Sequence, residues 1–264
     1  MSSTLHARFV ELHRTDRPLL LANAWDAASA RLLQDAGAPA VATSSAAVAW
    51  SRGYADGGAL PREELLSSLA GIVRVTQVPV TADIEDGYGD DPVQVAALVA
   101  DVAVAGAVGI NLEDGGGDPA LLAAKIRAIR ARLGGTPLFV NARTDVYLRG
   151  LAEGEAAVRE TIARLRIYRD AGADGGFVPG LVDAAHARAV ADAVDLRINV
   201  MARPGLAPIA DLAAAGVCRI SVGPWLFYRA YTPALDAARA FLAGDVGPML
   251  QPGLDFATLN RLFG

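Results

Sequence analysis

Short apolar runs alternate along the chain with longer stretches in which apolar residues recur at the spacing of an α-helix. We expect the apolar runs to be buried strands and the longer stretches to be helices. Eight strands that alternate with helices predict an α/β fold of the (β/α)₈ TIM-barrel type. The eight runs are Leu19–Ala22, Ala40–Thr43, Val78–Asp83, Val108–Glu113, Leu138–Ala142, Gly176–Val178, Leu196–Val200 and Arg219–Val222.

The ends of the helical stretches support a repeated strand-helix unit. An Ala-Gly pair precedes the next apolar run in DAGAPAV, VAGAVGI, RDAGADGG and AAAGVCRI, and glycine in the left-handed conformation commonly ends a helix before a parallel strand. A doubly wound open sheet is the alternative, but no G-x-G-x-x-G follows the first run. The helical stretches include Arg62–Thr76, Pro92–Ala105, Pro119–Leu133, Glu155–Ala171, Asp183–Val194 and Ala207–Ala215.

The last part of the chain predicts helices beyond the eighth run. Residues Pro224–Gly264 carry a helical pattern that Gly244–Gly253 interrupts, which indicates a final helix and a C-terminal helical extension. No linker divides the chain, and barrels of this type commonly have about 250 residues. We therefore expect residues 1–264 to form a single catalytic domain.

Composition narrows the classes of function. The net charge is -5, with 53% hydrophobic residues and no long run of like charge, which argues against a nucleic-acid partner. No stretch has the pattern of a signal peptide or a membrane span, so we expect a cytoplasmic protein. The single cysteine, Cys218, lies in the apolar run VCRISV and is expected to be a buried thiol. Three scattered histidines make a zinc site improbable, so that a bound metal would be a hard ion held by oxygens.

Acidic side chains gather where the third, fourth and fifth runs end. Barrel enzymes place their active sites at the C-terminal ends of the strands, so these side chains should share one rim. Carboxylates at close range repel one another unless a cation neutralises them, and Mg²⁺ accepts a few carboxylates together with retained waters. The sequence therefore predicts Mg²⁺ held directly or through water by Asp83, Glu85 and Glu113.

Two other features complete the predicted rim. The alternative for the acids is a role in helix caps and ion pairs, which we expect for Asp91 and Asp118 because each precedes a proline. In ATSSAAVAW, the small residues after the second run would let an anion reach the backbone amides. This predicts an anion site at Ser44, Ser45 and Ala46, although a tightly packed helix start is the alternative. Trp50 and Tyr54 follow and either line the pocket or pack in a loop.

Seven segments, in this order, resemble the isocitrate lyase/phosphoenolpyruvate mutase superfamily over nearly the whole chain. Each motif is weak alone, and together they are highly specific. The segments are NAWDAASARLLQDAGAPAVATSSAAVA, ADGG at 55–58, TADIEDGYG, INLEDG, NARTD, INVMARPG and RISVG.

The resemblance implies a helix-swapped barrel that assembles as a dimer or tetramer, binds Mg²⁺ or Mn²⁺ and passes through a pyruvate-like enolate. It places metal binding on Asp83, Glu85 and Glu113, and an acidic loop residue on Asp56. It places the substrate carboxylate on the amides of Ser45 and Ala46 beside Ser44, and the arginine that neutralises the anion on Arg143. We also count Trp50 and Asn199, the latter in INVMARPG, as candidate substrate-binding residues.

The chain departs from the superfamily where proton donors are expected. The lyases carry a Lys-Lys-Cys-Gly-His-type loop after the position of Glu113, and this chain has EDGGGDPALLAAKI instead, in which only Lys125 follows. The Lys and Asn of the mutase and phosphonate-cleaving branches are absent too, and FVPG stands where a histidine is expected. The glycines at 115–117 suggest a flexible entrance.

Metal, anion site and Arg143 suffice for making an enolate beside a carboxylate. The sequence therefore predicts an Mg²⁺-dependent decarboxylase or lyase of a small 2-oxo or 2-hydroxy dicarboxylic acid, with oxaloacetate as the least demanding substrate. One alternative is C–C cleavage of a 2-alkylmalate or methylisocitrate analogue, with Tyr88 or Asp56 as the acid or base. Others are a phosphonopyruvate-type C–P enzyme and a 2-oxo-acid-binding protein without turnover.

Overall fold

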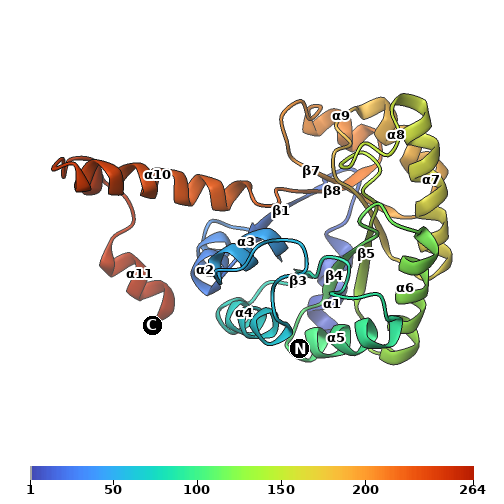
Figure 1. The fold of residues 1–264 in the computed structure, drawn as a ribbon, viewed down its shortest axis with the longest axis horizontal. Coiled ribbons are helices and arrows are strands. Elements are labelled where there is room, and N and C mark those ends of the chain that lie inside the picture. The colour runs from blue at the N-terminus through green and yellow to red at the C-terminus, as the bar shows by residue number, and fades with distance from the viewer. Residues whose placement is uncertain (1) are drawn as a thin grey trace.

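Eight parallel strands close into a barrel in the order β1 to β8 (Figure 1). The computed structural model describes residues 2–264. Each predicted run overlaps a strand, and the ends differ by at most two residues, so the predicted barrel is confirmed over the open sheet. The strands are β1 Leu19–Ala24, β2 Val41–Thr43, β3 Val80–Asp83, β4 Gly109–Glu113, β5 Phe139–Arg143, β6 Gly175–Val178, β7 Arg197–Met201 and β8 Val217–Ser221.

Most helices lie on the outside of the barrel, between successive strands (Figure 1). The predicted caps are confirmed, because the carboxylates of Asp91 and Asp118 accept hydrogen bonds from the first turns of their helices. The helices are α1 Ser2–Glu11, α2 Ala27–Asp35, α3 Ser45–Ser51, α4 Arg62–Val75, α5 Pro92–Val104, α6 Pro119–Leu133, α7 Gly154–Asp170, α8 Ala184–Ala193, α9 Ile209–Ala214, α10 Trp225–Leu242 and α11 Phe256–Phe263, with a 3₁₀ turn η1 at Pro248–Leu250.

The glycines of the predicted Ala-Gly pairs end four of these helices. Gly37, Gly106, Gly172 and Gly216 have φ values of 93°, 105°, 107° and 89°. A side chain with a Cβ atom adopts this region at a cost, and the conformation turns the chain from the helix into the following strand. The repeated pairs therefore mark the return of each helix to the barrel.

The interior of the barrel changes character from one end to the other. Helix α1 closes the N-terminal end, where the buried Phe9 packs with Leu19, Ala40 and Phe139. Midway, the inward side chains are polar: Asn111, Asn141, Asn199 and Arg219 are all buried. The larger apolar core lies outside the strands, between the sheet and the surrounding helices.

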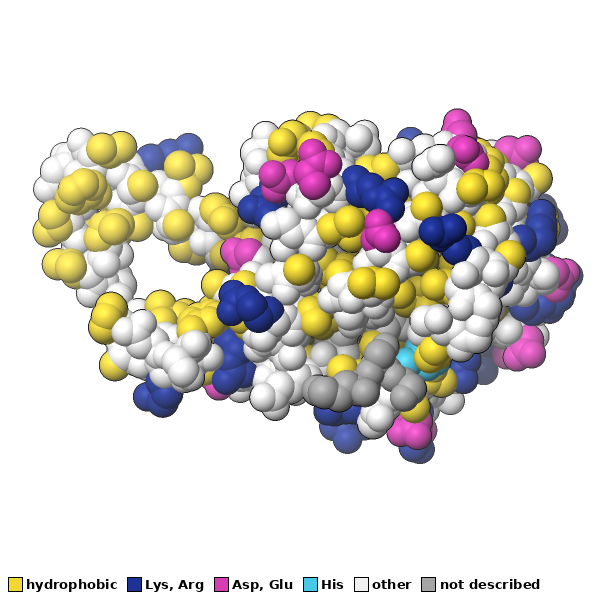
Figure 2. Space-filling view, turned by 90° about the horizontal axis from the view of Figure 1, so that it is seen from below, with side chains coloured by type: hydrophobic (Ala, Val, Ile, Leu, Met, Phe, Trp, Pro, Cys, Tyr) yellow, Lys and Arg dark blue, Asp and Glu magenta, His cyan; other side chains and the backbone are white. Residues whose placement is uncertain are grey.

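Helix α10 leaves the body of the molecule after β8 and projects as an arm, from which η1 and α11 turn back (Figure 1). None of its residues is buried. Figure 2 shows hydrophobic side chains gathered on this arm, and they include Tyr231, Leu235 and Phe241. The predicted final helix and C-terminal extension are confirmed. Cys218 is buried as expected, and within residues 2–264 no helix is long and apolar enough to cross a bilayer.

Candidate active site

The carboxylate of Asp83 lies at the C-terminal end of β3, against the start of α3. Its Oδ2 accepts hydrogen bonds from the backbone N–H of Ser45 at 3.2 Å and from Ser45 Oγ at 3.1 Å. Its Oδ1 is buried and has no hydrogen-bond partner within residues 2–264. The other predicted anion-site residues, Ser44 and Ala46, are buried beside it, and the Ser44 side chain caps α3. The structure thus brings the predicted metal and anion residues together.

Glu85 reaches the same rim through an unusual backbone conformation. Its φ is 52°, in the left-handed region that non-glycine residues occupy at a cost. Oε2 accepts a hydrogen bond of 2.5 Å from the N–H of Gly58, in the loop after β2, and the buried Oε1 lacks a partner among the described residues. Burial and the charge of Asp56 raise the pKa of Glu85 to about 7. A cation nearby would therefore favour the ionised form of this carboxyl group.

Glu113 and Arg143 end the neighbouring strands β4 and β5, where they are register partners. Arg143 Nη1 lies 2.6 Å from Glu113 Oε2, and its Nε and Nη2 bind the two oxygens of Asp145 at 2.6 and 3.0 Å. Burial, together with the charges of Asp83 and Asp145, raises the pKa of Glu113 to about 8, although Arg143 opposes this shift. The bidentate pair with Asp145 holds the guanidinium at the rim.

The two candidate proton carriers are close to the acids. Asp56 is exposed in the loop after α3, and burial of part of its carboxyl group and the charge of Asp83 raise its pKa. Tyr88 has a φ of 60° and a buried hydroxyl without a hydrogen-bond partner in the described chain. Burial and the charges of Glu85 and Asp83 raise the pKa of Tyr88. Tyr88 is thus present as a neutral phenol that can donate a hydrogen bond.

Two candidate substrate-binding residues are already engaged with other parts of the protein. Trp50 packs against the start of α10, with ring-centroid distances of 5.5 Å to Phe227 and 5.7 Å to Tyr228. Asn199 is buried in the barrel, where its side chain contacts Asn141 and the carbonyl oxygens of Val200 and Arg219. Their role in substrate binding remains a prediction.

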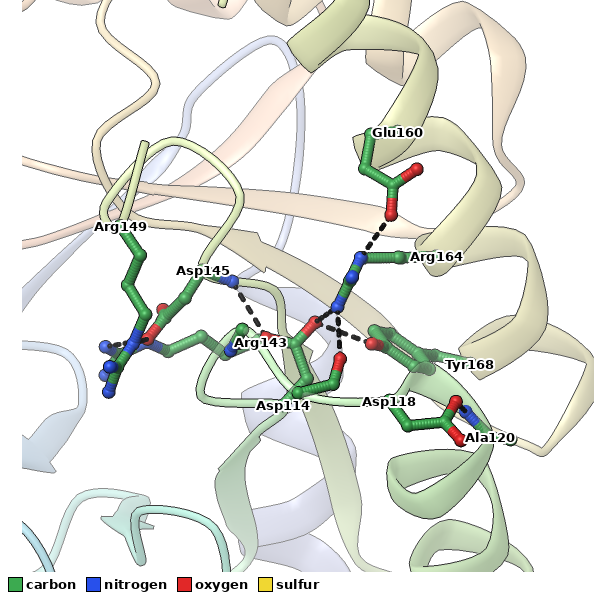
Figure 3. A network of polar contacts seen from close by, with 11 residues as sticks. Asp114, Asp118, Ala120, Arg143, Asp145, Arg149, Glu160, Arg164 and Tyr168 are labelled. Atoms are coloured by element: carbon green, nitrogen blue, oxygen red, sulfur yellow. Dashed lines mark hydrogen bonds and ion pairs between the residues drawn. The ribbon is translucent and has the colours of Figure 1, made fainter. Parts of the chain in front are cut away.

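A buried network of hydrogen bonds and ion pairs lies behind the rim and supports the segment of Arg143 (Figure 3). This network was not predicted from the sequence. Asp114 accepts hydrogen bonds from Tyr168 Oη at 2.6 Å, from Arg164 Nη1 at 3.1 Å and from the N–H of Asp145 at 3.0 Å. These donors outweigh burial and lower the pKa of Asp114. Arg164 and Tyr168 are four residues apart on α7 and hence share a face, but only the fold shows that this face meets β4.

The glycine loop after β4 packs beneath Arg149. Gly115 and Gly116 have φ values of 55° and 78°, and a Cβ atom at Gly116 would lie 3.0 Å from Arg149 Cδ. Asp114 Oδ1 also accepts a hydrogen bond from the N–H of Gly116 at 2.9 Å. Lys125 lies in α6 and donates to the carbonyl of Asp86, away from this loop. The backbone conformation of Gly115 and Gly116 and the close approach of Arg149 therefore favour glycine in this loop.

The rim fits a hydrated Mg²⁺ better than a metal bound by protein ligands alone. In the part of the chain that the structure describes, no three His, Cys, Asp or Glu side chains are arranged to bind a metal ion by themselves. However, Asp83 Oδ1 and Glu85 Oε1 are buried without partners, and Mg²⁺ commonly takes one or two carboxylates and keeps several waters. A divalent cation would also relieve the repulsion that raises the pKa of Glu85 and Glu113.

The comparisons with known proteins agree with this fold. Residues 9–242 match the family model for phosphoenolpyruvate phosphomutase. Uncharacterized protein Rv1998c of Mycobacterium tuberculosis is 39% identical over 92% of each chain, and oxaloacetate decarboxylase of Pseudomonas fluorescens is 28% identical over 90% of this chain and 85% of its own.

A solved structure from Burkholderia cenocepacia agrees over the same length. It is 41% identical, covers 90% of this chain and 99% of its own, and has a TM-score of 0.86. The match to the family model spans all eight strands of the barrel. The chain therefore belongs to the phosphoenolpyruvate phosphomutase family, within the isocitrate lyase/phosphoenolpyruvate mutase superfamily.

Proposed function

We propose that the protein is an Mg²⁺-dependent lyase that decarboxylates a small 2-oxo dicarboxylic acid of the oxaloacetate type through an enolpyruvate intermediate. The observation that carries the proposal is the pair of buried, unpartnered carboxylate oxygens on Asp83 and Glu85, next to the ion pair of Glu113 and Arg143. The relationship to an oxaloacetate decarboxylase supports this choice of substrate.

Asp83, Glu85 and Glu113 would hold Mg²⁺, directly or through water. Bound Mg²⁺ would act as a Lewis acid that stabilises negative charge on the 2-oxo group as the C–C bond breaks. The structure supports this ligand set because all three side chains lie at the C-terminal rim, two of them on adjacent strands. Mn²⁺ has similar ligand preferences and is expected to substitute.

The remaining groups would bind and orient the substrate. The amide of Ala46 in the first turn of α3 has no partner within the helix and can receive the C1 carboxylate, beside the amide of Ser45, which donates to Asp83. Arg143 would offset the charge that develops on the enolate, because its guanidinium is held at the rim by Asp145. Ser44 keeps the first turn in place through its cap.

Decarboxylation suits a site whose β4–α6 loop carries neither cysteine nor histidine as a proton donor. Carbon dioxide departs without taking a proton, so the leaving group requires no donor. The enolate then needs one proton, which water or Asp56 would supply; burial and the charge of Asp83 raise the pKa of Asp56. The lack of a Cys or His proton donor in this loop is therefore compatible with decarboxylation.

The test is the release of pyruvate and CO₂ from oxaloacetate by the purified protein. We expect turnover with Mg²⁺ well above the decarboxylation that the free metal causes, and loss of this turnover after chelation with restoration by Mg²⁺ or Mn²⁺. Turnover that is equal with and without chelator would contradict the metal dependence. Metal-dependent binding of oxalate without any product would favour a 2-oxo-acid-binding protein.

A second candidate reaction is C–C cleavage of a 2-hydroxy acid of the 2-alkylmalate or methylisocitrate type. The position of Asp56 favours it, because this carboxyl group lies close enough to Ser45 and Asp83 for both to shift its pKa. Cleavage of a 2-hydroxy acid needs a base for the hydroxyl group, and Asp56 or Tyr88 would fill the role. A substrate panel that includes these acids and phosphonopyruvate separates the C–C from the C–P reaction.

We also propose that the protein assembles by exchange of α10 between copies. A groove of about 1220 Å³ follows the outside of β1 between α2 and α9, and its apolar lining includes Leu20, Leu33 and Ile209. The next barrel helix after α9 would occupy this place, but α10 projects away from it with its apolar side chains exposed (Figures 1 and 2). In the proposed assembly, α10 of a second copy packs into this groove.

Sedimentation analysis tests this assembly. We expect the protein to sediment as a dimer or tetramer of the 27.3 kDa chain, and Leu20→Glu to shift it towards the monomer. Leu20 is 54% exposed in the single chain, so a glutamate at this position should leave the fold of the monomer intact. In the assembly the same carboxylate would be buried in the apolar groove and would destabilise the contact between copies. Val104→Glu, on the outer face of α5, is the matched control and should leave the mass unchanged. A wild-type monomer would refute the exchange.

A further inference from the structure

Arg219 is a fully buried arginine in the centre of the barrel. It lies on β8, and its exposed fraction is 0%. Its Nη2 donates to Asn111 Oδ1 at 3.2 Å, whereas Nε and Nη1 have no hydrogen-bond partner within residues 2–264. Burying a charge without a paired carboxylate costs several kcal/mol, on the order of the protein's whole stability. A residue kept at such a cost calls for a role beyond packing.

Asn111, the hydrogen-bond partner of the guanidinium, belongs to a chain of buried asparagines. Asn111 Oδ1 also accepts a hydrogen bond of 2.9 Å from Asn141 Nδ2, which in turn lies 3.1 Å from Asn199 Oδ1. Asn199 Nδ2 donates to the carbonyl oxygen of Arg219. These residues come from β4, β5 and β7, so the network ties the partner of the guanidinium and the backbone of Arg219 to three strands.

The charge of Arg219 acts on the carboxylate rim. Asn111, its hydrogen-bond partner, is the register partner of Asp83 on the adjacent strand, so Arg219 lies one layer of side chains below the metal-site aspartate. Burial lowers the pKa of Arg219 to about 9, and the charge of Asp83 opposes that shift. The guanidinium therefore stays positive at neutral pH.

Towards the closed end of the barrel, the charge of Arg219 acts on His13, which stacks on Phe139. Burial and the charge of Arg219 lower the pKa of His13 to about 3, so that the imidazole is neutral. A neutral His13 does not pair with the guanidinium, whereas the carboxylate of Asp83 at the rim is the charge that acts on Arg219.

We propose that Arg219 is an electrostatic positioning residue: a fixed cation inside the barrel that opposes the metal ion from below and favours the negative charge of the bound acid. In this proposal Arg219 contacts neither the metal nor the substrate. It acts through the positive electrostatic potential that its guanidinium contributes near Asp83. A preorganised charge in a low-dielectric interior contributes in this way without reorganising during the reaction. The part that concerns turnover rests on the proposed function, whereas the part that concerns metal and anion binding does not.

The two effects have opposite signs, which separates this role from a structural one. In Arg219→Met, which keeps an unbranched side chain similar to the aliphatic stem of arginine and removes the charge, we expect Mn²⁺ to bind about three- to tenfold more tightly in a titration without substrate. Oxalate should bind the Mn²⁺-loaded variant at least about tenfold more weakly than the Mn²⁺-loaded wild type. Loss of shape at the rim would weaken both ligands together.

Arg219→Lys is the matched control, because it keeps the charge and should leave both affinities near those of the wild type. Arg219→Gln, which retains a hydrogen bond to Asn111, replaces Arg219→Met if that variant does not fold. Weaker Mn²⁺ binding in the neutral variants, or equal oxalate affinity, would overturn the inference while leaving the proposed function intact. A wild-type protein that binds no Mn²⁺ would refute the metal site itself and with it both proposals.

Discussion

Asp83→Asn is expected to abolish metal-dependent decarboxylation, with a loss of at least about 100-fold in kcat/KM. Loss of a residue that merely supports a metal ligand typically costs about 10- to 100-fold, so removal of the ligand charge itself should cost no less. The substitution keeps the shape of the side chain, and the amide oxygen can still accept the hydrogen bonds of Ser45. The change therefore removes the charge at Oδ1 and little else.

The matched control is Asp118→Asn at the start of α6. This side chain accepts a hydrogen bond of 2.8 Å from the N–H of Ala120, and asparagine caps a helix about as well as aspartate. The same substitution should therefore leave turnover and melting temperature nearly unchanged. Mn²⁺ titration and turnover of oxaloacetate are the measurements. If Asp83→Asn binds Mn²⁺ like the wild type, Asp83 is not a metal ligand.

Arg143→Lys is expected to lower the turnover number about 10²- to 10³-fold, the range found when one preorganised electrostatic donor is removed. Arginine binds Asp145 through two parallel hydrogen bonds and reaches Glu113 at the same time. A lysine ammonium group cannot occupy these three positions together. Arg143→Ala would leave buried carboxylates unpaired and cost about 3–5 kcal/mol of stability, so lysine is the cleaner test.

Arg149→Lys makes the same substitution on the other arginine that contacts Asp145. Arg149 is exposed, and its Nε lies 3.4 Å from Asp145 Oδ2, so its replacement should change turnover by less than about threefold, as expected of an exposed ion pair. Steady-state kinetics with oxaloacetate and thermal unfolding together provide the measurements. Equal losses in the two variants would place the charge requirement on Asp145 or the loop instead of on Arg143.

The local pattern of apolar and polar residues was sufficient to predict the strands and the residues at the C-terminal rim of the barrel. A barrel strand has one face towards the interior and one towards the helices, so its residues read as a continuous apolar run. A polar residue that ends such a run must then lie at the C-terminal rim. For this reason Asp83, Glu113 and Arg143 could be identified as neighbours before the fold was known, and the register of β4 and β5 pairs two of them.

Contacts between distant segments could not be predicted in the same way. The network of Asp114, Arg164 and Tyr168 joins residues up to 54 positions apart, and Trp50 packs on a helix that begins at Trp225. An arginine in the apolar run CRISV gives no local sign that it points into the barrel, since side chains alternate between both faces of a strand. The position of Arg219 follows only from the closed sheet.

The sequence by itself determined the number and order of strands, the caps and glycine ends of the helices, and the set of acids at the rim, because each of these depends on residues that are near one another in the chain. Only the tertiary structure decided which polar groups are left without partners, which charge lies beneath Asp83, and that α10 leaves the barrel. These depend on burial and on the distances between strands, and such quantities exist only once the barrel has closed.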